Sequence, residues 1–338
     1  MPKLYVREYS RALSGETVFI ACREGILRDY FQEIISDIKF LVRHGIHTTL
    51  LHNVSNRFSN QKLFKRLKFL LPDVDMIRVP PETDFYAFAL DYRQKISKII
   101  FLERKHLTDP KGRNINAIAI HNDHQNPKEY GEIISNVNFR GPLEKICKKI
   151  EAGFYKRVHV LPAGKNAIKR ELFTIEGSGT IIARDFHETF SGVVSEKQAD
   201  MVSGILDIYK GEGFLKPRSK AYIIKNLENF YVTRIDGIIV GCVEKKHLDD
   251  TTAELGALAI STRFLNQRVG VFTINSFIAE MRLNGYGQFI SLTNNPSLSR
   301  LYLSLGFEKK SPLRYRSRQD QSPGVSMFYK KGLARFQV

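Results

Sequence analysis

The sequence contains no tryptophan and only three cysteines among its 338 residues. Cys22, Cys147 and Cys242 are far apart, and no two of them form a C-x-x-C pair. An odd number of widely spaced cysteines argues against a disulfide framework and against a cysteine zinc site. The cysteine pattern therefore fits a reducing compartment, and we expect a cytoplasmic protein.

Long hydrophobic runs are also missing. No apolar run approaches the ~18 residues that a membrane-spanning helix needs. The first eight residues, 1–8, lack the apolar segment of a secretory signal peptide. We therefore expect a soluble protein with no membrane partner.

Acidic residues are scarce relative to basic ones, with 35 Asp and Glu against 52 Lys and Arg and a net charge of +17. Such a charge attracts polyanions or simply aids solubility. The stretch 62–71 places Lys62, Lys65, Arg66 and Lys68 between apolar residues, which is typical of a solvated helix face. A nucleic-acid partner is therefore the minority interpretation.

The length and the 43% hydrophobic content predict two globular domains, each with its own core. In the first half, buried-strand patterns at 18–22, 48–51 and 98–102 alternate with helical patterns such as 30–42. Alternation of this kind implies crossover helices and a parallel sheet. The first domain is therefore predicted to be α/β.

The second half begins with a hairpin pattern. Two β-prone runs, 230–235 and 238–243, are joined by Asp236-Gly237, a strong hairpin signal. A third strand at 254–260, a helix, a strand at 288–292 and a last helix follow. This order predicts a mixed, largely antiparallel α/β domain.

A candidate anion site lies between the third strand and the next helix. The loop Gln267, Arg268, Val269, Gly270 and Val271 leads into an apolar helical stripe, so it caps a helix N-terminus. Backbone N–H groups there lack intrahelical partners and favour a phosphate. Taken alone, a short glycine-containing turn is a weak indication.

Together, Glu254, this loop, Asn295 and Tyr302 resemble the acyl-CoA site of GNAT-type N-acetyltransferases. Gln267 and Gly270 match the family's loop pattern, while Phe272 replaces its last small residue. The resemblance implies acetyl-CoA as cosubstrate, with no metal. It also implies that the loop residues and Asn295 contact the cofactor, and that the backbone of Leu258, Ala259 and Ile260 does so like an added strand.

An amine acceptor needs a base, and the departing thiolate, whose thiol has a pKa of about 8.5, benefits from an acid. We expect Glu254 to be the base, directly or through water, and Tyr302 to be the acid. The structural alternatives are that Glu254 is an ordinary strand carboxylate and that Tyr302 only packs against Phe307.

The segments 171–174 and 177–180 resemble the end of the kinase-like domain in N-acetylglutamate kinases and synthases. In bacterial N-acetylglutamate synthases an amino acid kinase-like domain precedes a GNAT domain, and the stretch 200–219 resembles the opening of the latter. The resemblance implies a truncated amino acid kinase-like parallel sheet domain at 1–184 and a GNAT domain at 185–338.

The same resemblance implies L-glutamate as the acceptor, with Arg218 and Lys246 binding its carboxylates. The segment Arg314–Arg318 would replace a C-terminal substrate-binding element of the relatives. Two alternatives remain: a different amine, such as another amino acid or a protein lysine, and a non-catalytic acyl-CoA-sensing protein.

The kinase-like half lacks the paired glycines and the glycine-rich loop that bind phosphates in the kinases it resembles, since the loops 22–25 and 52–55 read CREG and HNVS. We therefore expect no phosphoryl transfer. An arginine effector site near Glu171 and Gly177–Gly179 and a homo-oligomer are further implications of the resemblance. Because the domain is so short, we favour the alternative that Glu171 has a local structural role and that the glycines form a turn. His121 and His124, in a polar loop, are expected to be exposed rather than metal ligands.

Overall fold

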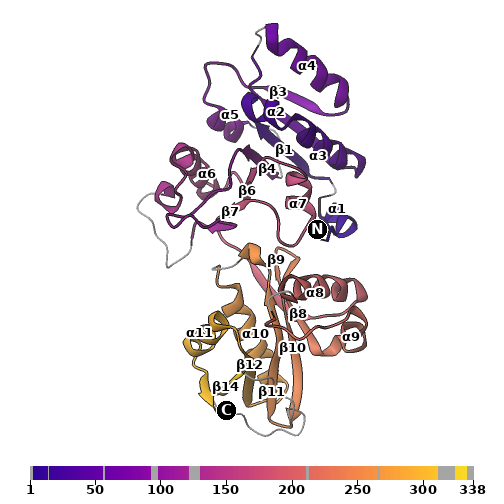
Figure 1. Cartoon of the computed structure of the whole chain (residues 1–338), viewed down its shortest axis with the longest axis vertical. Coiled ribbons are helices and arrows are strands. Elements are labelled where there is room, and N and C mark those ends of the chain that lie inside the picture. The colour runs from indigo at the N-terminus through magenta and orange to yellow at the C-terminus, as the bar shows by residue number, and fades with distance from the viewer. Residues whose placement is uncertain are drawn as a thin grey trace. The chain divides into compact units, whose positions relative to one another are not determined.

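The computed structural model describes residues 3–13, 15–55, 58–92, 98–121, 130–210, 213–264, 267–310 and 324–332. The chain divides into two compact units, Met1–Phe186 and His187–Val338 (Figure 1). This division falls after residue 186, where the sequence analysis placed it after residue 184. Among the described residues no helix has the length and apolar character to cross a membrane.

The N-terminal unit contains a seven-stranded sheet in the order β3-β2-β1-β4-β6-β7-β5. The five strands from β3 to β6 are parallel, while β7 runs antiparallel to β6. The predicted α/β class is confirmed, and the sheet is mixed at one edge. Its strands are β1 (Thr17–Cys22), β2 (His47–His52), β3 (Asp75–Arg78), β4 (Lys98–Glu103), β5 (Ala117–Ala119), β6 (Arg157–Pro162) and β7 (Thr180–Ala183).

Helices pack on both faces of this sheet. On one face α5 (Phe85–Asp91) and α6 (Arg140–Glu151) enclose a core that includes Phe19, Phe101 and Ile146. On the other, α3 (Phe31–Arg43) contacts α7 (Ala167–Phe173), which also contacts α1 (Val6–Ala12) (Figure 1). The remaining helical elements are α2 (Glu24–Asp29), α4 (Phe58–Leu70), η1 (Tyr130–Ile133) and η2 (Val137–Phe139). The predicted amphipathic helix is confirmed as α4, whose basic residues are exposed.

The C-terminal unit contains a second seven-stranded sheet, ordered β13-β14-β12-β11-β10-β9-β8. Every neighbouring pair is antiparallel except β11 and β12. The predicted hairpin is confirmed, since Asp236 and Gly237 both have positive φ, as a tight turn of this kind requires. The strands are β8 (Glu188–Gly192), β9 (Phe230–Ile235), β10 (Ile238–Asp249), β11 (Thr252–Ile260), β12 (Gln288–Thr293), β13 (Glu308–Lys310) and β14 (Ser326–Lys331).

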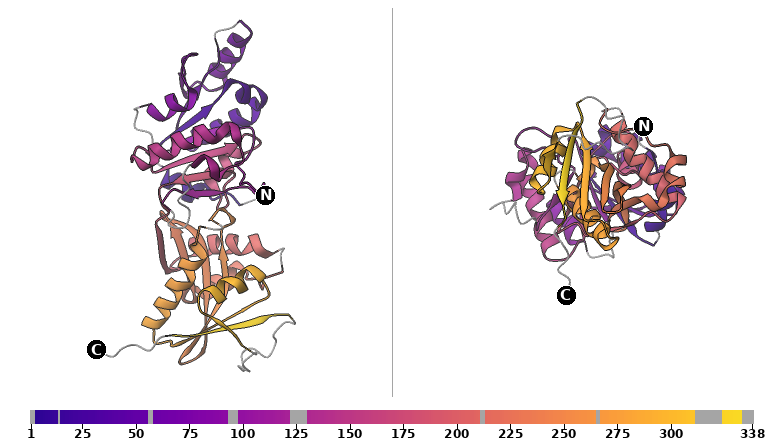
Figure 2. Two further views of the ribbon diagram at one scale, coloured as in Figure 1. Left: turned by 90° about the vertical axis from the view of Figure 1, so that its left-hand side faces the viewer. Right: turned by 90° about the horizontal axis from the view of Figure 1, so that it is seen from below.

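Helices cover both faces of this sheet as well (Figures 1 and 2). One side carries α8 (Glu196–Tyr209) and α9 (Lys220–Lys225), and the other carries α10 (Val269–Leu283) and α11 (Pro296–Ser304). Short 3-10 turns lie at Leu227–Asn229 and Thr262–Phe264. The apolar stripe predicted after the loop forms the buried side of α10, where Ile274, Ile278 and Met281 join the core. The expected mixed, largely antiparallel domain is confirmed.

The two parallel strands of this unit separate along their length. Pairing of β11 with β12 runs from Thr252 and Gln288 to Leu255 and Ser291. Beyond Leu255, β11 continues to Ile260 while pairing only with β10, and Ala257 interrupts it with a positive φ of 45°. A non-glycine residue in this region marks a bulge that bends the strand. The divergence leaves one edge of β11 without a partner strand among the described residues.

Candidate functional site

A cavity of about 290 Å³, here called the central cavity, opens where β11 and β12 separate. Its floor comes from the two strands, including Glu254 and Thr293, and its rim from the loop 213–218. The charged groups that line it are Glu254 and three cations, Lys216, Arg218 and Lys246. The cavity thus combines one carboxylate with a surplus of positive charge.

Glu254 reaches the cavity from a buried position, with 2% of its surface exposed. It pairs across the strands with Lys246, whose Nζ lies 3.8 Å from Glu254 Oε1 and 3.9 Å from Glu244 Oε2. Lys246 therefore offsets the charge of two buried carboxylates. This arrangement keeps a carboxylate at the cavity wall without leaving its charge uncompensated.

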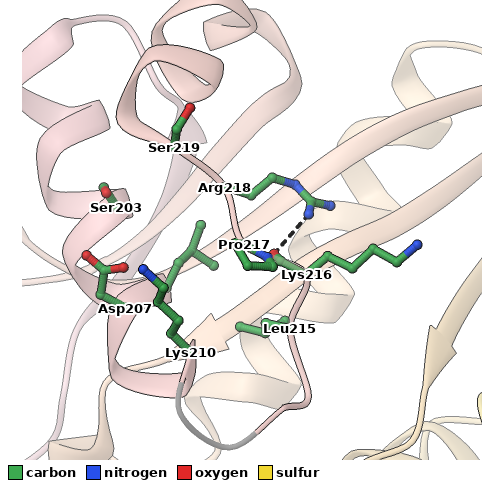
Figure 3. A pocket seen from close by; sticks show the side chains of 9 residues that line it. Ser203, Asp207, Lys210, Leu215, Lys216, Pro217, Arg218 and Ser219 are labelled. Atoms are coloured by element: carbon green, nitrogen blue, oxygen red, sulfur yellow. Dashed lines mark hydrogen bonds between the residues drawn. The ribbon is translucent and has the colours of Figure 1, made fainter. Parts of the chain in front are cut away.

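Arg218 makes a dense set of contacts within the protein. Its Nε and Nη2 donate to Glu244 Oε2 at 3.0 and 2.7 Å, and its Nη1 donates to the Lys216 carbonyl oxygen at 3.0 Å (Figure 3). The other Glu244 oxygen accepts from the Tyr222 hydroxyl at 2.6 Å. Burial, followed by this hydrogen bond to Glu244, raises the pKa of Tyr222. The predicted carboxylate-binding role of Arg218 stays a prediction, and the structure adds a role in holding the loop.

A second hollow of about 290 Å³ lies on the other side of the same loop, against α8 (Figure 3). It shares Leu215, Lys216, Pro217 and Arg218 with the central cavity and adds Ser203, Leu206, Asp207, Lys210 and Ser219. In Figure 3 the Lys216 ammonium points away from α8. The segment 215–218 therefore separates the second hollow from the central cavity.

Tyr302 lies in α11 with none of its surface exposed. Its ring packs against Phe307 and Phe328, with ring centroids 5.0 and 5.5 Å apart. Its hydroxyl lies 2.7 Å from that of Ser291, which lies 3.0 Å from the Leu255 carbonyl oxygen. Burial raises the pKa of this phenol, and the Ser291 hydrogen bond offsets that only in part. Among the described residues, the lining of the central cavity does not include Tyr302, and its acid role stays a prediction.

The predicted anion loop precedes the first turn of α10. Arg268 has a positive φ of 59° and its carbonyl oxygen accepts from the Phe272 N–H at 3.0 Å, the first intrahelical bond. The N–H groups of Val269, Gly270 and Val271 precede that bond and cannot be satisfied within the helix. The Phe272 ring is half-buried and its amide is already used. The departure at Phe272 therefore leaves these three donors unaltered.

The other predicted cofactor contacts lie near this helix. Ala259 and Ile260 pair with Cys242 and Gly241 of β10, so the opposite edge of β11 is the one left open beside β12. Leu258 is half-buried in the same segment. The Asn295 side chain caps α11 by accepting from the N–H groups of Ser297 and Leu298 at 2.8 and 3.2 Å. Asn295 thus has a structural role besides the predicted contact.

Glu244, Tyr222 and Lys216 were not expected from sequence to belong to this site. The signal for Glu244 is its place on a strand that reads as buried, where an acidic side chain requires a charged partner. No sequence feature indicated that Lys216 belongs to the site, because a lysine in a polar loop cannot be distinguished by sequence from an ordinary surface lysine.

In the N-terminal unit, side-chain oxygens accept hydrogen bonds from backbone N–H groups of the loops after β1 and β2, which correspond to the phosphate-binding loops of kinases. Glu24 Oε2 accepts from the Ser55 N–H at 2.9 Å, and Asn53 Oδ1 accepts from the Glu24 N–H at 2.7 Å. Buried Glu171 Oε2 accepts from the N–H groups of Ser178 and Gly179 at 2.8 and 3.2 Å. These contacts give Glu24 and Glu171 structural roles within the unit.

Two expectations fall partly outside the described residues. These are the basic segment Arg314–Arg318 and the loop histidine His124, whereas His121 is described and exposed. Within the described ranges, no group of three His, Cys, Asp or Glu residues is arranged to hold a metal ion.

Residues 200–307 match the Acetyltransferase (GNAT) family. Together with the separated strands and the helix that follows the loop, this match assigns the C-terminal unit to the GNAT class of acetyltransferase domains, as the resemblance in the sequence predicted.

Curated relatives of the chain are amino-acid acetyltransferases. An amino-acid acetyltransferase of Pseudomonas fluorescens (strain Pf0-1) is 26% identical over 179 residues, which are 52% of this chain and 40% of the relative. The amino-acid acetyltransferase of Ectopseudomonas mendocina is 25% identical over the same shares. The chain thus spans less than half the length of these curated relatives.

The crystal structure of N-acetylglutamate synthase from Neisseria gonorrhoeae, complexed with coenzyme A and L-arginine, resembles the chain over 98% of both chains. The TM-score is 0.53 and the sequence identity is 15%. At this identity the likeness concerns the fold. The predicted resemblance to N-acetylglutamate synthases, with a kinase-like unit before a GNAT unit, is confirmed at that level.

Proposed function

We propose that the chain is an acetyl-CoA-dependent N-acetyltransferase that acetylates the α-amino group of L-glutamate. The observation that carries the proposal is the central cavity, where the Glu254 carboxylate lies at the separation of β11 and β12 among three cations. A cavity of this size suits a small acceptor. The amino-acid acetyltransferases among the relatives support the same reaction.

Acetyl-CoA would bind with its pyrophosphate on the N–H groups of Val269, Gly270 and Val271. Its pantetheine arm would lie along the open edge of β11 at 258–260 as an added strand, and N–H groups there would polarise the thioester carbonyl. The coenzyme A bound to the gonococcal relative supports this cosubstrate.

The amine nitrogen then attacks the thioester carbon, its proton passes to Glu254, and the C–S bond breaks to give the amide and the CoA thiolate. Tyr302 is the proposed donor of the proton that converts the thiolate to the thiol. Transfer is direct, so no acetylated side chain is required.

The surplus of cations in the central cavity favours an acceptor that carries carboxylates. Lys216, Arg218 and Lys246 line the cavity on the side of the loop and of β10. Charge-assisted hydrogen bonds from such groups are the usual means of recognising a carboxylate. Arg218 and Lys246 already face Glu244 and Glu254, so within the described residues Lys216 is the cation left for an acceptor carboxylate.

The test is mass-spectrometric detection of N-acetylglutamate after incubation with glutamate and acetyl-CoA, with CoA release measured across amino acids, polyamines and lysine peptides. Release confined to acidic amino acids supports the proposal. Activity confined to peptides would replace glutamate by a protein acceptor. Binding of acetyl-CoA in calorimetry without turnover on any amine would favour the sensing alternative.

We also infer that L-arginine is a candidate effector, because the gonococcal synthase was crystallised with it. Glu171, at the position suggested by the resemblance, already contacts Ser178, Gly179 and His159, so arginine would have to compete with them. Inhibition by L-arginine but not D-arginine would support the site.

A homo-oligomer and a cytoplasmic location remain part of the same proposal.

A further inference from the structure

The N-terminal unit holds a cavity of about 490 Å³, here called the switch-point cavity, that the proposed acetyl transfer does not use. It lies at the carboxyl ends of two neighbouring parallel strands, since Arg23 follows β1 and Glu103 ends β4. From β1 the chain proceeds to β2 and β3 on one side, while β4 has β6 on the other. Open parallel sheets bind ligands at the position where the strand order reverses in this way.

The lining of the switch-point cavity carries more positive than negative charge. Arg23, Arg104 and Lys105 contribute cations, and Glu103 is the one carboxylate among the lining residues. Glu103 is already satisfied, because Arg23 Nη2 donates to its Oε2 at 2.7 Å and the Tyr86 hydroxyl donates to its Oε1. The remaining field is therefore positive, which favours an anion.

Several donors of this lining remain available. Arg23 uses Nη2 for Glu103 and its Nε is buried, but 43% of its side chain is exposed, so the rest of the guanidinium is accessible to a ligand. Lys105 is exposed and forms no ion pair within the described part of the chain, whereas Arg104 pairs with Asp29. An arginine can donate five N–H bonds, so its pairing with Glu103 leaves capacity for a ligand.

The uncharged lining residues indicate what else the ligand carries. Leu107, Val137 and Phe139 provide an apolar wall, and Thr108, Ser135, Asn136 and Asn138 provide hydroxyl and amide groups. Val137 is 70% exposed, so its side chain is accessible to the apolar part of a ligand. The matching ligand has an oxyanion head and a short apolar body.

The neighbouring loops argue against a polyphosphate. The Glu24 carboxylate accepts from the Ser55 N–H, and Asn53 accepts from the Glu24 N–H, so these loops after β1 and β2 are tied to each other. A negative side chain therefore stands where a phosphate chain would need donors. The ligand is consequently confined to the side of β1 and β4.

We propose that the switch-point cavity binds a small organic anion, whose carboxylate or phosphate head contacts Arg23 and Lys105 and whose apolar body rests on Leu107, Val137 and Phe139. The residues that line the site all belong to the N-terminal unit, and binding there involves no phosphoryl transfer.

Ligand-observed NMR with the full-length chain tests this, using benzoate, phenyl phosphate and the neutral isostere benzamide as probes. We expect saturable binding of at least one anion and none of benzamide at the same concentration. The probe with the lower dissociation constant, benzoate or phenyl phosphate, shows whether the site prefers a carboxylate or a phosphate head. Equal binding of all three probes, or of none, overturns the proposal.

Two exposed positions locate the site without disturbing the core. Lys105→Met removes one cation and Asn138→Asp adds one negative charge with little change of shape; each should raise the dissociation constant roughly ten-fold, the loss expected for one charge-assisted contact. Lys65→Met on α4 is the control for net charge and should change nothing. Weakening by Lys65→Met, or by Lys216→Met of the central cavity instead of by Lys105→Met, would show that the probe binds elsewhere and overturn the proposal.

Discussion

The Arg218 guanidinium donates two hydrogen bonds to one oxygen of Glu244, a carboxylate with 1% of its surface exposed. Lys246 lies 3.9 Å from the same oxygen, and Tyr222 donates to the other. This network connects the loop 213–218 with β10. It therefore fixes the rim of the central cavity, and Glu244 sets the position of two of the three cations there.

Arg218→Met should destabilise the fold by about 3–5 kcal/mol, because it leaves the buried Glu244 carboxylate without its main partner. The double variant Arg218→Met with Glu244→Gln should recover part of that loss, since no buried charge remains. Chemical denaturation of both variants measures the difference. Equal stability of Arg218→Met and the unmodified chain would contradict the structural role.

Glu254→Gln should lower kcat by about 10²–10⁴-fold, the usual contribution of a general base, while the dissociation constant for acetyl-CoA stays unchanged. Glutamine keeps the shape but cannot take the proton. Steady-state kinetics and calorimetry provide the two readouts. Glu308→Gln, an exposed carboxylate of β13, is the matched control; a kcat that responds equally in both variants would remove Glu254 from the base role.

Tyr302→Phe should slow turnover by about ten-fold or more without weakening acetyl-CoA binding, if the phenol donates the proton to the thiolate. Ser291→Ala is the control, because it removes the same hydrogen bond but keeps the phenol. Equal effects of the two variants on kcat, with a shared loss of stability near 1 kcal/mol, would show that the pair is structural.

Lys216→Met and Lys246→Met should each raise the KM for glutamate roughly ten-fold and leave the KM for acetyl-CoA unchanged, because each removes a cation that faces the acceptor. Lys225→Met, an exposed position on α9, is the control. If the glutamate KM is unaffected in both cavity variants, the acceptor does not present a carboxylate to this wall.

Asp37 links α3 to the start of α7 and should make stability depend on pH. It is 1% exposed, and its Oδ2 accepts from the Ile168 N–H at 2.9 Å. Burial raises its pKa to about 6, above an unfolded value of about 3.9. The native state therefore binds more protons between these values, and stability falls as pH rises from about 4 to about 6, by roughly 3 kcal/mol.

Denaturation across this pH range should show that fall in the unmodified chain and not in Asp37→Asn, which cannot ionise. Asp73→Asn, an exposed carboxylate of the same unit, should keep the original profile. Identical profiles for Asp37→Asn and the unmodified chain would refute the assignment.

Much of the fold followed from local patterns. Asp236-Gly237 predicted its hairpin because the required backbone angles are set by those two residues alone. The apolar spacing after the loop predicted α10 in the same way, since a helical stripe depends only on spacing along the chain. The antiparallel direction of β7, which lies between β6 and the edge strand β5, was not foreseen, because strand direction depends on how a distant segment returns to the sheet.

The sequence by itself determined the order of the two units, the hairpin and the loop before α10, because each of these depends on residues that are close together in the chain. It also supplied Glu254 and Tyr302 as the candidate base and acid. Only the tertiary structure decided which groups share a cavity. It placed Glu254 among Lys216, Arg218 and Lys246, buried Tyr302 beside Ser291, and joined Arg218 to Glu244. Those contacts join residues distant in the chain, and strand register, bulges and burial determine them, none of which local propensity specifies.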